Sequence, residues 1–166
     1  MTVLSGNTLR MYAADGAPLV NPFVYEKTII NGMSYGCSLA GYDIRVKEDI
    51  KLWTGNFTLA SSVEEFHMPK NVIGFVHDKS SWARKGLSLF NTVIEPGWKG
   101  YLTLEMVYNE PSPGPTILSI PAGSPIAQIV FMYVDEVTRG YEGKYQNQKQ
   151  GPVEAIFENP STLPSL

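Results

Sequence analysis

One short stretch of this sequence has the residue types and spacing to bind an anion. Residues 80–85 (SSWARK) are the one stretch with a helical signature, with Ser80 as a suitable N-cap and Gly86 as a C-terminal stop. A helix N-terminus presents free N–H groups and a partial positive charge, so with Ser81, Arg84 and Lys85 nearby it suits a phosphate. The simpler alternative is a capped, solvated turn.

A second candidate is a single carboxylate. Residues 101–108 alternate in polarity, which predicts a strand with Leu102, Leu104 and Met106 on one face and Glu105 on the other. Most such glutamates are simply solvated. In a closed pocket, burial would raise the pKa of Glu105 and let it act as a general acid and base.

Several catalytic devices are excluded by what the sequence lacks. The one cysteine, Cys37, rules out an intrachain disulfide framework and a Cys-rich zinc site, and it suits a small buried position. His67 and His77 lie outside any His-x-Glu plus Pro-Cys-x-x-Cys pattern, so zinc-dependent nucleobase deamination is excluded. No P-loop is present, and two separated histidines do not favour a histidine-based triad.

The composition and net charge limit the kinds of partner that the protein can bind. The 166 residues are 43% hydrophobic and only 17% charged, with a net charge of −3, so the chain can bury a core but has no broad basic surface for a nucleic-acid polymer. A pocket for one nucleotide remains possible. No apolar run approaches the roughly 18 residues that span a bilayer, and no secretion signal is evident. We therefore expect no membrane partner and a cytoplasmic protein, or one in the host cytoplasm if it is viral.

The elements that must position these residues are strands. Gly (15) and Pro (12) are spread evenly, and short segments rich in Val, Ile, Thr, Tyr and Phe lie between them. Residues 43–46 and 101–108 alternate, residues 72–76 form a short apolar run, and residues 126–134 suit a strand buried on both faces. The prediction is an all-β fold with one short helix.

Domain organisation is simple. Prolines confine residues 109–115 to a loop. We expect one β domain over residues 1–157 and a Pro-containing tail over residues 158–166, which suits an arm exchanged with a neighbouring chain.

Four stretches in order resemble the dCTP deaminases of the dUTPase and dCTP deaminase superfamily. They are residues 40–45 (AGYDIR), 79–86 (KSSWARKG), 95–105 (EPGWKGYLTLE) and 143–152 (GKYQNQKQGP). The resemblance implies a distorted jelly-roll or β-barrel domain, of the dUTPase-like β-clip type, that forms a homotrimer with active sites between subunits.

Within that superfamily the motifs favour deamination. The Gly-rich terminal arm of a dUTPase is absent, whereas residues 144–148 and Glu105 match the deaminase pattern. Two features depart from it: residues 87–94, which line the base pocket by resemblance, have the length of the dUTPase hairpin, and Glu95 stands where both branches usually have Asp.

The resemblance also implies residue roles. Glu105 would be the catalytic acid and base, Ser80 would orient the attacking water, and Arg84 would reach the phosphates or order the pocket. Trp98 would pack under the deoxyribose and exclude a 2′-hydroxyl. The expected substrate-binding residues are Ser81, Lys85, Glu95, Trp98, Tyr141, Lys144, Tyr145 and Gln148.

The expected activity is therefore metal-independent hydrolytic deamination of dCTP to dUTP and ammonia. Mg²⁺ would arrive on the triphosphate, with no metal ligand from the protein, and Asp43 would be structural. Three alternatives stay open: a dUTPase, a bifunctional deaminase and diphosphatase that makes dUMP, and a nucleotide-binding regulator.

Overall fold

The computed structural model describes residues 2–109 and 116–158, and within them it shows a mostly β protein with short helices. This confirms the predicted fold class. The predicted loop at 109–115 lies, apart from Asn109, outside the described residues, as does the tail after Glu158. Within the described ranges, the helices are too short to cross a membrane.

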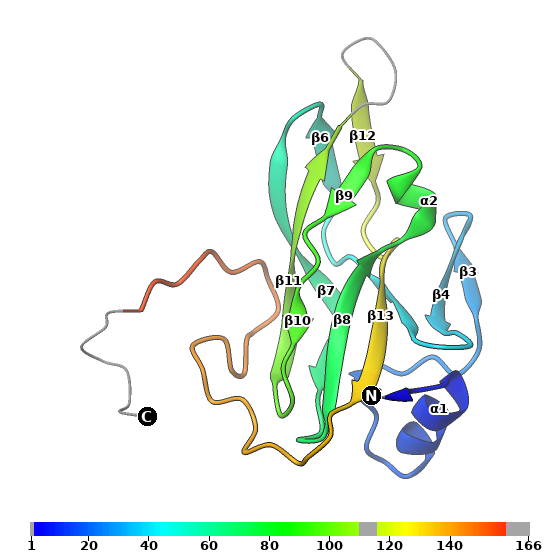
Figure 1. Ribbon diagram of the computed structural model, residues 1–166. Helices are drawn as coiled ribbons and strands as arrows, with labels where there is room; N and C mark the ends of the chain where they lie inside the picture. The colour runs from blue at the N-terminus through cyan, green and yellow to red at the C-terminus, as the bar shows by residue number, and fades with distance from the viewer. Residues whose placement is uncertain (1, 110–115, 159–166) are drawn as a thin grey trace.

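The larger sheet runs in the order β10-β8-β13-β5-β4-β3, and β1 also pairs with β13 (Figure 1). Its strands are β1 (Thr2–Val3), β3 (Thr28–Ile30), β4 (Met33–Cys37), β5 (Tyr42–Arg45), β8 (Val72–Asp78), β10 (Val93–Ile94) and β13 (Pro125–Tyr133). All of its pairings are antiparallel.

A second sheet runs in the order β2-β7-β11-β9, and a small third sheet joins β12 to β6. These strands are β2 (Val20–Asn21), β6 (Ile50–Trp53), β7 (Phe57–His67), β9 (Leu87–Leu89), β11 (Lys99–Tyr108) and β12 (Ile117–Ile120). The long β7–β11 pairing shifts register between Tyr101 and Thr103, where β7 accommodates two extra residues. Both main sheets contribute to one hydrophobic core.

The four predicted strands are present as β5, β8, β11 and β13. The alternation of residues 43–46 did not predict the burial in β5, where Asp43 is buried together with Tyr42 and Ile44. In β11 the residues Leu102, Leu104 and Met106 are buried, and Glu105 lies on the opposite, half-buried face. In β13, predicted to be buried on both faces, Ile129 and Phe131 are buried, but Gln128, Val130 and Met132 on the other face are only half-buried. Cys37 is buried as expected, and burial raises the pKa of its thiol.

The helix prediction was incomplete. Besides α2 (Ser80–Ala83), the chain forms α1 (Gly6–Ala14), which the sequence analysis missed because only Gly6 and Leu9 of this helix are buried, too few for an apolar stripe. The predicted N-cap of α2 was also wrong: Lys79 occupies that position without a side-chain cap, and Ser80 is the first helical residue.

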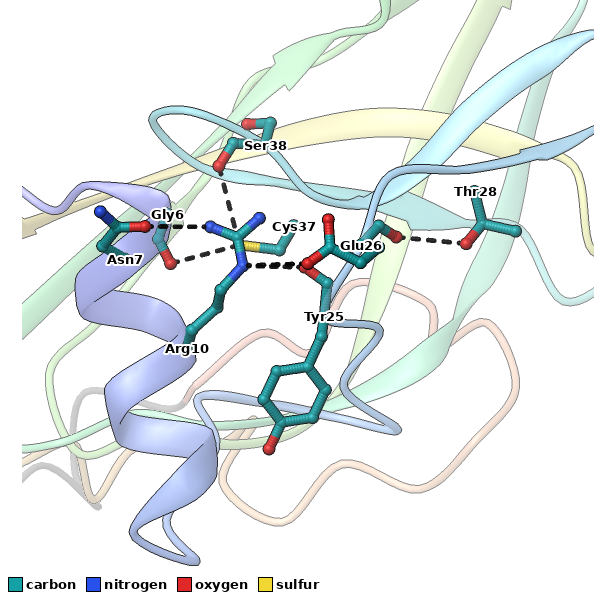
Figure 2. Close-up of polar contacts among 8 residues, drawn as sticks. All are labelled: Gly6, Asn7, Arg10, Tyr25, Glu26, Thr28, Cys37 and Ser38. Atoms are coloured by element: carbon teal, nitrogen blue, oxygen red, sulfur yellow. Dashed lines mark hydrogen bonds and ion pairs between the residues drawn. The ribbon is translucent and has the colours of Figure 1, made fainter.

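Tertiary contacts hold α1 in place (Figure 2). A Cβ on Gly6 would lie 1.9 Å from the carbonyl oxygen of Ser38, so only glycine permits this close approach. The Cys37 thiol donates to the Gly6 carbonyl at 3.4 Å, and Arg10 Nε donates to the Tyr25 carbonyl at 2.9 Å. The helix is therefore anchored to the segment around β4 by specific polar contacts.

Replacing Ser5, the N-cap of α1, by Ala should lower the free energy of unfolding by about 1 kcal/mol. The Ser5 side chain accepts a hydrogen bond from Thr8 N at 3.2 Å, and Ala leaves that donor to solvent. Urea denaturation of Ser5→Ala beside Thr2→Ala, a change at an exposed position outside the helix, measures the difference. Equal midpoints for the two variants would show that the cap adds no stability.

Candidate active site

The candidate site is built on β11, whose alternation turns Thr103 and Glu105 to the same face. Glu105 pairs with Leu59 of β7, and its carbonyl accepts a hydrogen bond from Phe90 N at 3.0 Å. The backbone of β11 is therefore held on both sides at this residue.

A cavity of about 610 Å³ opens over this face. It is lined by Phe57, Leu59, Thr92, Val93, Ile94, Glu95, Trp98, Leu102, Thr103, Glu105, Tyr141, Tyr145, Gln148, Val153, Glu154 and Ala155. Six of the residues predicted for the site are among them: Glu95, Trp98, Glu105, Tyr141, Tyr145 and Gln148. A volume of this size suits a small-molecule ligand.

One wall of the cavity is the C-terminal segment 140–156, which we call the strap. It runs beside β11 and β10 in Figure 1. Gly100 bridges to Gln148 in parallel pairing, and Trp98 Nε1 donates to the Tyr145 carbonyl at 2.8 Å. The strap is therefore hydrogen-bonded to the start of β11.

Two glycines make this close packing possible. Gly97 has φ +80°, and a Cβ there would lie 2.7 Å from Gly140 Cα. Gly100 has φ +146°, and a Cβ there would lie 2.7 Å from Gln148 N. Both positions need glycine on conformational and steric grounds, which explains the Pro-Gly-Trp-x-Gly pattern of residues 96–100.

Hydrogen bonds also connect the strap to the cavity face. Gln148 Nε2 donates to the Tyr101 carbonyl at 2.8 Å and to Thr103 Oγ1 at 2.7 Å. Tyr141 OH accepts from Tyr145 N at 3.2 Å, and Tyr145 OH accepts from Ile156 N at 3.0 Å. These contacts fix the polar groups at the cavity wall.

Glu105 has the electrostatic environment of an acid–base group. Its desolvation by burial raises the pKa of the carboxyl above the usual 4.5, and a hydrogen bond from its own backbone opposes this in part. A raised pKa makes a carboxylate a stronger proton acceptor, which suits a group that accepts a proton and returns it. Glu105 is therefore a half-buried carboxylate and not a fully solvated one.

Glu105→Gln should make the folded protein more stable than wild type at pH 8. The folded pKa is raised, so wild type loses stability as the pH rises from the usual 4.5 through that pKa, whereas Gln has no proton to lose. The difference should shrink as the pH falls and become independent of pH well below 4.5, where the carboxyl is neutral in both states. Urea denaturation at several pH values tests this, and a pH-independent difference would contradict it.

The charged side chains that line the cavity, among the described residues, are all acidic. Among the described residues that line it, Glu95, Glu105 and Glu154 are acidic, and none is Lys, Arg or His. A polyanionic ligand cannot be held by such a wall alone. The cavity of one chain therefore suits the uncharged part of a nucleotide.

The other predicted residues lie elsewhere. Ser80, Ser81, Arg84 and Lys85 are exposed on or just after α2, which Figure 1 shows at the upper right, away from the strap. Lys144 is outside the cavity lining, and its Nζ donates to the carbonyl of Ile156. One chain thus does not bring the α2 residues to Glu105.

α2 is nevertheless rigidly supported. The ammonium of its N-cap, Lys79, lies 3.1 Å from Asp43 Oδ2, and these residues are only 8% and 6% exposed. Trp82 Nε1 donates to the Pro125 carbonyl at 2.7 Å. Asp43 is therefore placed as a structural partner, which supports the role expected of it.

Sequence reasoning missed Thr103. It lines the same cavity as Trp98 and Glu105, and its hydroxyl accepts hydrogen bonds from Gln148 and Val153 of the strap. The signal was available, because the alternation that turned Glu105 out of the core applies equally to Thr103, two residues earlier. Glu154 was missed without such a signal, because it lies outside any strand.

Comparison with known proteins agrees with these features. A model of the dCTP deaminase-like family matches residues 39–134. The dCTP deaminase of Campylobacter hominis is 31% identical, covering 84% of this chain and 89% of that protein, and that of Roseiflexus castenholzii is 33% identical, covering 89% and 96%.

Solved structures agree on the fold. The 2′-deoxycytidine 5′-triphosphate deaminase of Agrobacterium tumefaciens superposes with a TM-score of 0.61 at 15% identity, covering 80% of this chain and 48% of that one. The EIAV dUTPase superposes with a TM-score of 0.50 at 22% identity, covering 64% and 85%. The chain has a dUTPase-like fold, and its sequence relatives decide the branch: it belongs to the dCTP deaminase family.

Proposed function

We propose that this protein deaminates dCTP, converting dCTP and water to dUTP and ammonia. The observation that carries the proposal is Glu105, a half-buried carboxylate with a raised pKa in a cavity that suits a base and its sugar. The relatives that cover most of the chain are dCTP deaminases, which supports the same reaction.

The chemistry requires one group that moves protons in both directions. Glu105 takes a proton from water as the water oxygen bonds to C4 of the base, and it delivers that proton to N3. Glu105 then takes the proton of the new C4 hydroxyl and delivers it to the amine: the C4–N4 bond breaks, ammonia leaves, and the carbonyl of uracil forms at C4. Ser80 of a neighbouring subunit would orient the water.

The walls of the cavity support the roles of its other residues. Trp98 is buried and hydrogen-bonded to the strap, so it is a rigid surface for the deoxyribose that would clash with a 2′-hydroxyl. Tyr141, Tyr145 and Gln148 face the cavity from the strap, where they would contact the nucleotide.

The phosphates require positive charge from outside this cavity. Arg84 and Lys85, with the hydroxyls of Ser80 and Ser81, are exposed on or beside α2 and would be supplied by a neighbouring subunit. We therefore propose a homotrimer in which each site joins Glu105 of one chain to α2 of the next.

Mg²⁺ would enter on the triphosphate. Within the described ranges, no three side chains of His, Cys, Asp or Glu gather where they could hold a metal ion. The ion would be held by phosphate oxygens and water, and the protein's part of the reaction needs no metal ligand. A cytoplasmic setting suits a deoxynucleotide enzyme of this kind.

The test is to incubate the pure protein with dCTP, dUTP and dCDP in the presence of Mg²⁺. Ammonia, pyrophosphate and the base of the product are assayed separately. Ammonia and dUTP from dCTP are expected. Pyrophosphate and dUMP from dUTP would instead indicate a dUTPase or a bifunctional enzyme, with Glu95 as the carboxylate to replace next, and binding without products would indicate a regulator.

A further inference from the structure

The side-chain amide of Gln148 can be oriented without ambiguity. One of its two atoms faces the Tyr101 carbonyl oxygen at 2.8 Å, and a carbonyl only accepts hydrogen bonds. The atom there must be the nitrogen, Nε2. Its second hydrogen is directed to Thr103 Oγ1 at 2.7 Å, so Thr103 is the acceptor in that bond.

A second donor reaches the same hydroxyl. The backbone N–H of Val153 points to Thr103 Oγ1 at 3.1 Å, and a backbone N–H can only donate. A hydroxyl oxygen has two lone pairs, and these two contacts use both. Thr103 can then only donate. Its side chain lines the cavity, and the hydroxyl donates no hydrogen bond to any of the described residues.

The position of the Thr103 hydroxyl indicates which atom of the base could accept its hydrogen bond. Thr103 and Glu105 share a face of β11 with Cα atoms about 7 Å apart, and Trp98, which comes just before β11, lines the same cavity. With the sugar at Trp98 and C4 at Glu105, Thr103 faces the middle of the base. The C5–C6 edge of a pyrimidine has no acceptor, whereas the opposite edge has O2 and N3, and N3 is where Glu105 delivers its proton.

We propose that the Thr103 hydroxyl donates a hydrogen bond to O2 of the pyrimidine and so holds C4 against Glu105. This assignment rests on the proposed function. It also has a catalytic consequence: as water adds to C4, electron density moves onto N3 and through the ring to O2. A donor fixed at O2 therefore binds more strongly in the transition state than in the ground state.

The test compares dCTP with its 2-thio analogue, in which sulfur at C2 is a much weaker acceptor. We expect wild type to prefer dCTP in kcat/KM, and Thr103→Val, which keeps the shape of the side chain, to reduce that preference about tenfold. Thr103→Ser keeps the hydroxyl and should retain the preference. An unchanged preference in Thr103→Val would overturn the proposal and leave Thr103 as an anchor for the strap only.

Gln148→Met is the matched control, because it weakens the same anchor while leaving the Thr103 hydroxyl. It should lower kcat/KM for both nucleotides and retain the preference; loss of the preference in this variant would also count against the proposal. If Thr103→Val does not fold, Thr103→Cys, with a weak thiol donor, should show a reduced preference.

Affinity measurements can test the contact to O2 separately from the proposed function. The affinities of both nucleotides for Glu105→Gln, with and without Thr103→Val, test the contact to O2 without turnover. Equal effects of Thr103→Val on the two affinities would refute the contact. Failure of wild type to release ammonia from dCTP would refute the proposed function instead.

Discussion

Glu105→Gln is expected to reduce the release of ammonia from dCTP by about 10²-fold or more while the affinity for dCTP stays near that of wild type. Gln keeps the size and hydrogen-bonding reach of the side chain but cannot accept a proton from water. Binding should even tighten slightly, because the half-buried carboxylate no longer has to be desolvated. Steady-state kinetics and calorimetric titration with dCTP measure the two quantities.

Glu95→Gln provides the control, since Glu95 lines the same cavity but is exposed. It should have a smaller effect on ammonia release than Glu105→Gln. Wild-type ammonia release from the Glu105 variant would remove this residue from the mechanism. Such a result would restore the interpretation of Glu105 as a solvated strand carboxylate, and attention would shift to hydrolysis at the phosphates.

Two inactive variants should restore each other when their subunits mix. Arg84 lies beside exposed α2, outside the cavity that contains Glu105, so each proposed site needs both residues from different chains. Arg84→Ala and Glu105→Gln should each be nearly inactive alone. In trimers coexpressed from equal amounts of both, roughly one quarter of the sites combine an intact α2 with an intact Glu105. Ammonia release should recover to about that fraction of wild type.

The control is the double variant coexpressed with wild type, which has the same number of altered residues and also leaves about one quarter of the sites intact if they form between chains. If each site formed within one chain, the mixed single variants would stay inactive, whereas half of the sites in the control would be active. Light scattering must show the trimer in every sample. An active monomer would contradict the proposed assembly.

Local sequence was sufficient for four of the strands, β5, β8, β11 and β13, but not for others such as the long β7, and it supplied the acid–base candidate. The period of two in residues 101–108 predicts which side chains of β11 leave the core, because alternation follows from the geometry of one extended strand. Alternation also identified β5, whereas apolar runs identified β8 and β13. The motifs around Glu105 and α2 then indicated the family, which the comparisons confirm.

Other features depend on contacts between distant residues, and no local pattern determines them. α1 is anchored where Gly6 meets the Ser38 carbonyl, and the strap is seated where Gly97 and Gly100 let the backbone of residues 140–148 approach β11. The donor state of Thr103 follows from Gln148 and Val153, more than 40 residues away in the chain. The resemblance implied a site between subunits that contains both Glu105 and α2, and within one chain the residues of α2 are not part of the cavity that contains Glu105. The groups that share a cavity are determined by tertiary structure, because this depends on how the sheets pack and on where a distant segment such as the strap contacts them.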